Sequence, residues 1–171
     1  RIAWFIFFAA GLNYADRMAL ASVIPPLREE LGATDGQVGF MFSSFLWAYA
    51  VMSPVAGVLA DRFSRVRMIA WSLAGWSLCT LLMGLAPNVT ALCVLRLALG
   101  CAESFFLPAA VSLLGEHHGP ATRGKAMGLL MTGLNVGIVA GGSFAGYAAE
   151  HYGWRTGFWV LGGIGVILAF F

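Results

Sequence analysis

The sequence predicts an all-α membrane protein with six transmembrane helices, and two observations lead to this fold class. Hydrophobic residues make up 60% of the 171 residues and charged residues only 11%, with a mean hydropathy of +0.82, which is far from the composition of soluble domains. In addition, apolar segments of about 20 residues, the length that a helix needs to cross a bilayer, alternate with short polar breaks along the whole chain.

The apolar segments define six expected spans in chain order. Each break between them contains charged residues, glycine or proline, which favour turns and water-exposed connections. The expected spans are 2–27, 38–60, 66–86, 90–115, 124–149 and 155–171, and the breaks are centred on 28–36, 61–67, 86–88, 116–123 and 150–155.

The first and fourth spans share an unusual pattern. Asp16 and Arg17 interrupt the first, Arg96 and Glu103 interrupt the fourth, and a proline follows in each, at positions 25 and 108. This similarity between residues 1–86 and 90–171 indicates a three-plus-three inverted repeat, which many secondary transporters contain. In the fifth span, Gly133, Gly137 and Gly141 form a small-residue face suited to close helix packing.

The short loops predict the orientation. Lys and Arg are retained on the cytoplasmic side of a membrane, and they concentrate in the second and fourth breaks. The N-terminus is therefore expected to be cytoplasmic. The bases of those two breaks are Arg62, Arg65, Arg67, Arg123 and Lys125, whereas the other breaks hold only Arg28 and Arg155.

Several function classes are disfavoured. The basic residues are spread along the chain, so no surface for nucleic acid is predicted. Cys79, Cys93 and Cys101 lie in apolar runs without metal-ligand spacing, which argues against a disulfide framework or a zinc site. No cofactor or metal is expected. No nucleophile, base and orienting group occur together, so the sequence predicts neither catalytic residues nor an enzyme.

The second break carries the most specific motif. Residues 57–67 read GVLADRFSRVR, which resembles the loop signature G-x-L-x-D-R-x-x-R-x-R of the major facilitator superfamily. The resemblance implies a gating loop, in which the glycine permits close helix approach and the aspartate accepts hydrogen bonds from arginines. The candidate gating residues are Gly57, Asp61, Arg62, Arg65 and Arg67.

Two further motifs narrow the resemblance. Residues 96–100 are similar to the R-x-x-x-G pattern of the same superfamily, and residues 13–17 read NYADR, which resembles a signature shared by the anion:cation symporters and the spinster-like lipid transporters. The resemblance implies that residues 1–171 are the N-terminal half of a twelve-helix protein of the plasma membrane, with a C-terminal six-helix half missing. In the antiporter branches of the superfamily, a proline follows the second glycine of a glycine-rich element in the fifth span. Ile138 occupies that position here, which disfavours an antiporter.

The intramembrane charges suggest a mechanism, because charged groups at this depth usually carry function. Arg96 and Glu103 are seven positions apart and share a helix face. Arg17, about 22 Å from one side, and Arg96, about 9 Å from the other, lie at similar depth in a core roughly 30 Å thick. Guanidinium groups bind carboxylates bidentately, so the two arginines are predicted to bind an organic anion, with Asp16 and Glu103 as proton carriers.

The predicted function is therefore proton-coupled symport of a small organic anion, such as a sugar acid. Tyr14 and Asn135 are further candidates for the substrate site, and the lipid bilayer and the anion are the expected partners. Three alternatives stay open. The protein could be a spinster-like carrier of lysolipid or sphingolipid, it could be a non-transporting scaffold or receptor, or the four charges could be structural ion pairs that lock helices together.

Overall fold

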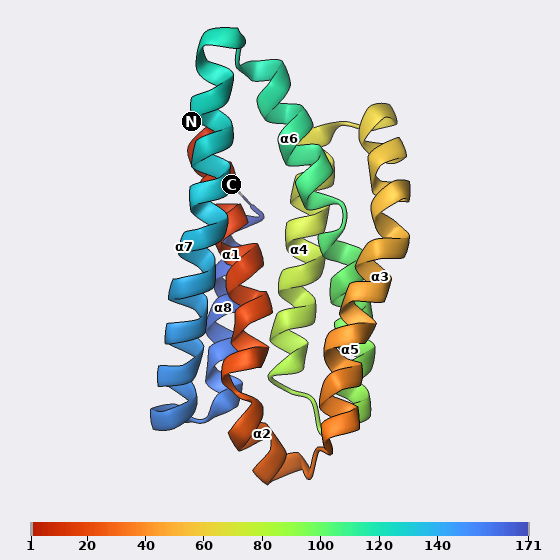
Figure 1. The fold of residues 1–171 in the computed structure, drawn as a ribbon, viewed down its shortest axis with the longest axis vertical. Coiled ribbons are helices and arrows are strands. Elements are labelled where there is room, and N and C mark those ends of the chain that lie inside the picture. Colours follow the sequence, from red (N-terminus) through yellow and green to blue (C-terminus); the bar gives the residue numbers. More distant parts are fainter. Residues whose placement is uncertain (1, 171) are drawn as a thin grey trace.

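The computed structural model describes residues 2–170, and Figure 1 shows them as an elongated bundle of helices. Within these residues there are eight α-helices and no strands. In chain order they are α1 (Ile2–Ser22), α2 (Ile24–Leu31), α3 (Asp35–Arg62), α4 (Arg65–Met83), α5 (Val89–Glu103), α6 (Phe106–His117), α7 (Pro120–Tyr152) and α8 (Trp154–Leu168).

The first and fourth expected spans are each broken into two helices. The first is interrupted at Val23, between α1 and α2, and the fourth at Ser104 and Phe105, between α5 and α6. A proline follows each interruption, and proline lacks the N–H that would continue the helical hydrogen-bond ladder. Near the interruption between α5 and α6, Ser72 Oγ of α4 donates a 2.6 Å hydrogen bond to the carbonyl oxygen of Ala102.

Local sequence signals explain where other helices begin. Thr34 forms a capping box with Gln37 at the start of α3, and the Asn88 side chain accepts from Ala91 N at the start of α5; both contacts satisfy N–H groups that lack helical partners. The turn after α2 needs Gly32, whose φ of 63° is disfavoured for residues with a side chain. The connections between the spans are short, and successive spans run in opposite directions (Figure 1).

The helices pair in a pattern that fits the inverted repeat. The first helix of each half packs against the second span of the other half, so α1 lies beside α7 and α5 lies beside α3. The third spans, α4 and α8, pack against each other, and α4 also contacts α5. The two halves of the chain are therefore interlocked, and the first spans that carry the charges are held inside the bundle.

Glycines bring the paired helices to backbone contact. A Cβ atom at Gly137 of α7 would lie 2.0 Å from the carbonyl oxygen of Gly11 in α1, and one at Gly100 of α5 would lie 2.5 Å from the carbonyl oxygen of Phe45 in α3. Gly133 makes a similar approach to α1. The structure confirms the packing face predicted from the spacing of the glycines in the fifth span.

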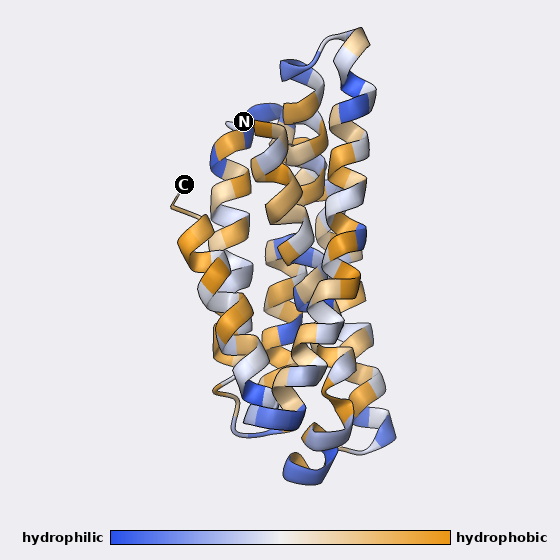
Figure 2. Cartoon of the chain, turned by 90° about the vertical axis from the view of Figure 1, so that its left-hand side faces the viewer, coloured by the Kyte–Doolittle hydropathy of each residue, from blue (hydrophilic) through white to orange (hydrophobic). Residues whose placement is uncertain are grey.

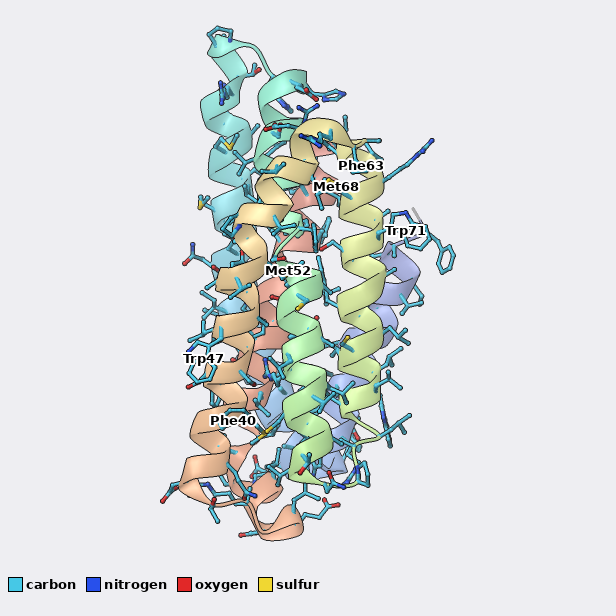
Figure 3. The ribbon with its side chains drawn as sticks, turned by 90° about the vertical axis from the view of Figure 1, so that its right-hand side faces the viewer. Phe40, Trp47, Met52, Phe63, Met68 and Trp71 are labelled. Atoms are coloured by element: carbon cyan, nitrogen blue, oxygen red, sulfur yellow. The ribbon has the colours of Figure 1, made fainter. Side chains whose placement is uncertain are left out.

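The surface of the bundle is suited to lipid. Hydrophobic residues predominate along its middle, where only a few hydrophilic segments occur, and most hydrophilic residues lie toward the two ends (Figure 2). Trp47 of α3 and Trp71 of α4 are 63% and 78% exposed and point away from the bundle (Figure 3). Among the described residues, four stretches are long and apolar enough to cross a membrane: α3, α4, α5 with α6, and α7. The 21-residue α1 is long enough, but its polar stretch at 13–17 lowers its hydropathy.

Candidate functional site

The four intramembrane charges come together where α1 meets α5. Asp16, Arg96 and Glu103 are buried, with 1–2% of their surface exposed. Arg17 Nε donates a 2.7 Å hydrogen bond to Glu103 Oε2, and the side chain of Arg17 is 18% exposed whereas that of Glu103 is fully buried. The ion pair therefore joins the two halves of the inverted repeat, and Arg17 is its more accessible member.

Aromatic rings surround the arginines. The guanidinium carbon of Arg17 lies 4.7 to 4.9 Å from the ring centroids of Tyr14, Phe45 and Tyr49. Arg96 lies 5.8 Å from the ring centroid of the same Phe45. Cation–π contacts of this kind stabilise an arginine away from water without neutralising its charge. Both cations thus share one aromatic wall and keep their positive charge.

Most polar atoms of this cluster have no partner within residues 2–170. Both carboxyl oxygens of Asp16, Nε and Nη2 of Arg96, Oε1 of Glu103 and Nδ2 of Asn13 are buried and make no hydrogen bond. Buried polar groups in folded proteins are nearly always paired, because an unpaired one costs free energy. Such a concentration is unlike a structural ion-pair lock, in which every group would be satisfied.

The third span contributes polar groups that the sequence reading did not single out. Trp76 and Thr80 of α4 are buried and face Asp16. Trp76 and Thr80 are four positions apart, which puts their side chains on one helix face. This spacing was the only sequence signal that could have linked them to a common site. The same spacing relates Phe45 and Tyr49 on α3. Polar or aromatic side chains in an apolar span are common, so this spacing alone did not separate them from packing residues.

Asn135 is the candidate that the structure leaves apart from the cluster. It lies on the exposed face of α7, and its side-chain amide donates a 2.8 Å hydrogen bond to the carbonyl oxygen of Met131 in its own helix. Tyr14, by contrast, contacts Arg17 directly. Within residues 2–170, the candidate anion site is therefore formed by α1, α3 and α5.

The loop motif differs from expectation in its contacts. Apart from its chain neighbours and the backbone of its own helix, nothing among residues 2–170 lies within 4 Å of a Cβ atom placed at Gly57. Asp61 is exposed and forms no ion pair in the described part of the chain. Arg65 instead donates to Ser112 Oγ at 2.6 Å and pairs with Glu116 at 2.5 Å. The reason is geometric: Arg65 begins α4 and reaches α6, whereas Asp61 lies on the exposed side of α3. Like Asp61, Arg62 and Arg67 are exposed.

At the opposite end, α2 is fastened to the start of α8. Arg155 pairs with Glu30 and donates a 3.3 Å hydrogen bond to the carbonyl oxygen of Ala86, while Trp154 Nε1 donates to Glu30 Oε2 at 2.7 Å. These donors hold the pKa of Glu30 below its usual range. We refer to Glu30, Ala86, Trp154 and Arg155 as the end clamp.

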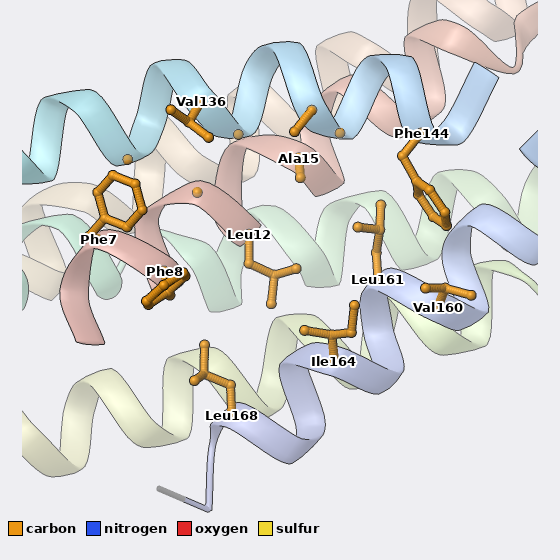
Figure 4. A pocket seen from close by; sticks show the side chains of 15 residues that line it. Phe7, Phe8, Leu12, Ala15, Val136, Phe144, Val160, Leu161, Ile164 and Leu168 are labelled. Atoms are coloured by element: carbon orange, nitrogen blue, oxygen red, sulfur yellow. The ribbon is translucent and has the colours of Figure 1, made fainter. Parts of the chain in front are cut away.

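A cavity of about 440 Å³ lies away from the charges. Its lining comes from α1, α7 and α8, is apolar and includes Phe8, Leu12, Phe144 and Ile164 (Figure 4). None of the four charged residues of the cluster lines it. The cavity therefore suits a hydrocarbon chain, whereas the charged cluster suits an anion.

Comparisons with known proteins agree with this architecture. The family model of the Major Facilitator Superfamily matches residues 6–171. Probable anion transporter 3, chloroplastic, of Arabidopsis thaliana is 36% identical over 74% of this chain and 25% of its own length. A probable galactarate/D-glucarate transporter of Escherichia coli K12 is 28% identical over 96% of this chain and 38% of its own length.

The fold has a close counterpart among solved structures. A bacterial homologue of the human lysosomal transporter Spinster, in an inward-facing and occupied conformation, superposes with a TM-score of 0.90 and 26% identity over 99% of this chain and 42% of its own. The chain thus spans between a quarter and about two fifths of the length of these relatives. It belongs to the major facilitator superfamily, a family of integral membrane transporters rather than enzymes.

Proposed function

We propose that the chain is the N-terminal half of a proton-coupled symporter of a small organic anion, a sugar acid or another carboxylate. The observation that carries this proposal is the incomplete charge cluster: Arg96 is buried with two unpaired nitrogens beside an aromatic wall that it shares with Arg17. Two guanidinium groups offer the paired donors that a carboxylate accepts. The sugar-acid and anion transporters named among the relatives support the choice of substrate class.

Charge balance explains why a proton would accompany the anion. Arg17 and Arg96 are balanced by Asp16 and Glu103, so a bound monoanion leaves one negative charge in a buried site. Burying uncompensated charge is costly, and protonation of one acid restores neutrality. A dianion would need both acids to be protonated. In this mechanism, the substrate takes the place of Glu103 on Arg17 when Glu103 accepts a proton.

Alternating access would then follow from partner exchange. With Glu103 on Arg17, α1 and α5 are tied together; with substrate on Arg17, that tie is released. The missing C-terminal half would supply the facing wall of the cavity, and residues 57–67 would gate the cytoplasmic side. We place the N-terminus in the cytoplasm, because the two basic breaks lie together at one end of the bundle (Figure 1). The plasma membrane remains the location expected from the family resemblance.

Proteoliposomes that contain the full-length transporter test this proposal. Radiolabelled D-gluconate and D-glucarate are offered with and without an inwardly directed pH gradient. The gradient is expected to drive accumulation, with D-gluconate uptake indifferent to membrane potential if one proton balances one negative charge. Loss of accumulation in Asp16→Asn, at unchanged protein level, would support the coupling role. Equal uptake with and without the gradient would contradict it.

A second candidate is a carrier of lysolipid or sphingolipid. It is favoured by the likeness to the Spinster homologue and by the apolar cavity between α1, α7 and α8. The same proteoliposomes distinguish the two, because movement of fluorescent lysophospholipid without sugar-acid uptake would favour the lipid. If neither compound moves in vesicles that hold correctly folded protein, a scaffold or receptor becomes the better explanation.

A further inference from the structure

Two buried polar side chains of α4 meet the charged cluster from a third helix. Trp76 is fully buried and Thr80 is 1% exposed. They lie one helical turn apart, and both face Asp16 of α1. Trp76 Nε1 and Thr80 Oγ1 have no hydrogen-bond partner within residues 2–170, and the same is true of both oxygens of Asp16. Donors and acceptors without partners therefore face one another between the side chains of α1 and α4.

A neighbouring hydroxyl shows that this arrangement is specific to one side of α4. Ser77 is also buried without a partner, but it packs against α8, because a Cβ atom at Gly165 would lie 2.0 Å from Ser77 Oγ. The Asp16 side of α4 thus carries Trp76 and Thr80, and the α8 side carries Ser77. Ser77 is consequently a matched position for experiments that delete a buried hydroxyl.

The other groups that act on Asp16 are charged. Glu103 and Arg96 face it from α5, and Arg17 follows it on α1. From α7, Gly141 packs against the neighbouring Ala15 and brings no charge to this point of the described chain. An anion that binds both arginines would leave Trp76 and Thr80 of α4 as the hydrogen-bond donors that face Asp16.

We propose that Trp76 and Thr80 are positioning residues that stabilise Asp16 in both of its protonation states, a role that rests on the proposed proton coupling. An indole N–H only donates, whereas a threonine hydroxyl donates or accepts. Toward an ionised Asp16, both groups donate. Toward a protonated Asp16, the carboxyl O–H donates to Thr80 Oγ1, and Trp76 Nε1 still donates to the other carboxyl oxygen. The proton on Asp16 comes from and returns to water, and Trp76 and Thr80 keep their own.

The ring of Trp76 has a separate packing contact that guides the choice of variants. It meets the ring of Phe106 edge to face, with centroids 5.3 Å apart, at the first residue of α6. Phe106 follows the break after Glu103. Trp76→Phe therefore removes the N–H donor while keeping an aromatic ring toward Phe106. Thr80→Val removes the hydroxyl without changing the shape of the side chain, and Thr80→Ser restores it.

Infrared spectroscopy of the full-length transporter in lipid tests the inference without any substrate. The absorbance of the carboxylic C=O band is measured as a function of pH. The titrating absorbance that is present in the unmodified protein and absent from Asp16→Asn is assigned to Asp16. The band is expected to titrate about one pH unit higher in Thr80→Val than in the unmodified protein, because Thr80 binds the ionised carboxylate more strongly than the protonated carboxyl, and the difference between a charge-assisted and a neutral hydrogen bond corresponds to about one pH unit. Thr80→Ser is expected to return the midpoint, and Ser77→Ala is expected to leave it unchanged.

Trp76→Phe gives an independent reading if Thr80→Val does not fold, and an upward shift of similar size is expected. The inference is overturned if the midpoint stays in place in the folded variants, or if Ser77→Ala moves it equally. The outcome for the proposed function is separate. If Asp16→Asn removes no titrating band, proton coupling through Asp16 fails; if Asp16 titrates but ignores both α4 variants, only the positioning role fails.

Discussion

The charged cluster inside the membrane and the end clamp use similar residues in opposite ways. In the end clamp, both carboxylate oxygens of Glu30 accept hydrogen bonds, one from Arg155 and one from Trp154. In the cluster, Glu103 uses one oxygen and Arg96 leaves two nitrogens unpaired. In the end clamp, water could satisfy a polar group that lost its partner, yet both oxygens of the carboxylate are bonded. In the buried cluster, an unpaired polar group costs free energy, yet several groups lack partners. This difference indicates that the cluster is arranged to change partners and that the end clamp is arranged to hold.

The largest expected effect comes from Arg96→Gln, which removes the buried cation. Two hydrogen bonds to a charged substrate would be lost, each worth about 1.5–3 kcal/mol, so uptake of radiolabelled sugar acid should fall by about 100-fold or more. The melting temperature should fall by only a few degrees, because protonation of Asp16 or Glu103 can restore neutrality when the buried cation is lost. Retained uptake in a folded Arg96→Gln protein would contradict the role of the cluster as a substrate site.

Glu103→Gln is expected to separate exchange from accumulation. The amide keeps an oxygen that can accept from Arg17 but cannot carry a proton at neutral pH, so accumulation driven by a pH gradient should drop by about tenfold or more. Exchange of internal for external substrate should persist. The two rates are measured in the same proteoliposomes. Proton-driven accumulation that survives, with exchange merely slowed, would remove Glu103 from the coupling mechanism.

A smaller effect is expected when the end clamp is broken. Arg155→Gln removes the ion pair with Glu30 and the contact with Ala86, which should lower the melting temperature by about 2–4 °C, while uptake changes by less than about twofold. Arg123→Gln is the matched control, since Arg123 is exposed, lies outside the gating motif and forms no ion pair among residues 2–170. A large loss of uptake at unchanged stability would mean that the end clamp is part of the transport cycle.

The smallest effect concerns the pH dependence of the end clamp. The pKa of Glu30 is lowered by its donors, so its contribution to stability is complete above the ordinary carboxyl value and is lost as the pH falls through the lowered pKa. Because Glu30 is a surface group, the change in melting temperature should be about 2 °C or less. The curve for Glu30→Gln should lack this step. Identical curves for both proteins would show that the pair contributes nothing measurable.

The sequence predicted much of the candidate site because charge in an apolar span is conspicuous. Asp16, Arg17, Arg96 and Glu103 stand out in any hydropathy reading, and the structure brings all four together. The aromatic wall was harder to foresee, since Phe45 looks like any packing residue until a guanidinium lies over it. Asn135 was singled out for its polarity, but its amide bonds to its own helix.

The sequence by itself determined the membrane character of the chain, the positions of the apolar segments and breaks, and the glycine face of the fifth span. These features depend on residues that are close together in the chain. Only the tertiary structure decided that Arg17 pairs with Glu103, that Arg65 reaches Glu116, and that Trp76 and Thr80 face Asp16. Those contacts join helices that are far apart in the chain, and their partners depend on helix rotation and on close approach at glycine contacts. A one-dimensional pattern gives the face of a helix but not the neighbour that the face will meet.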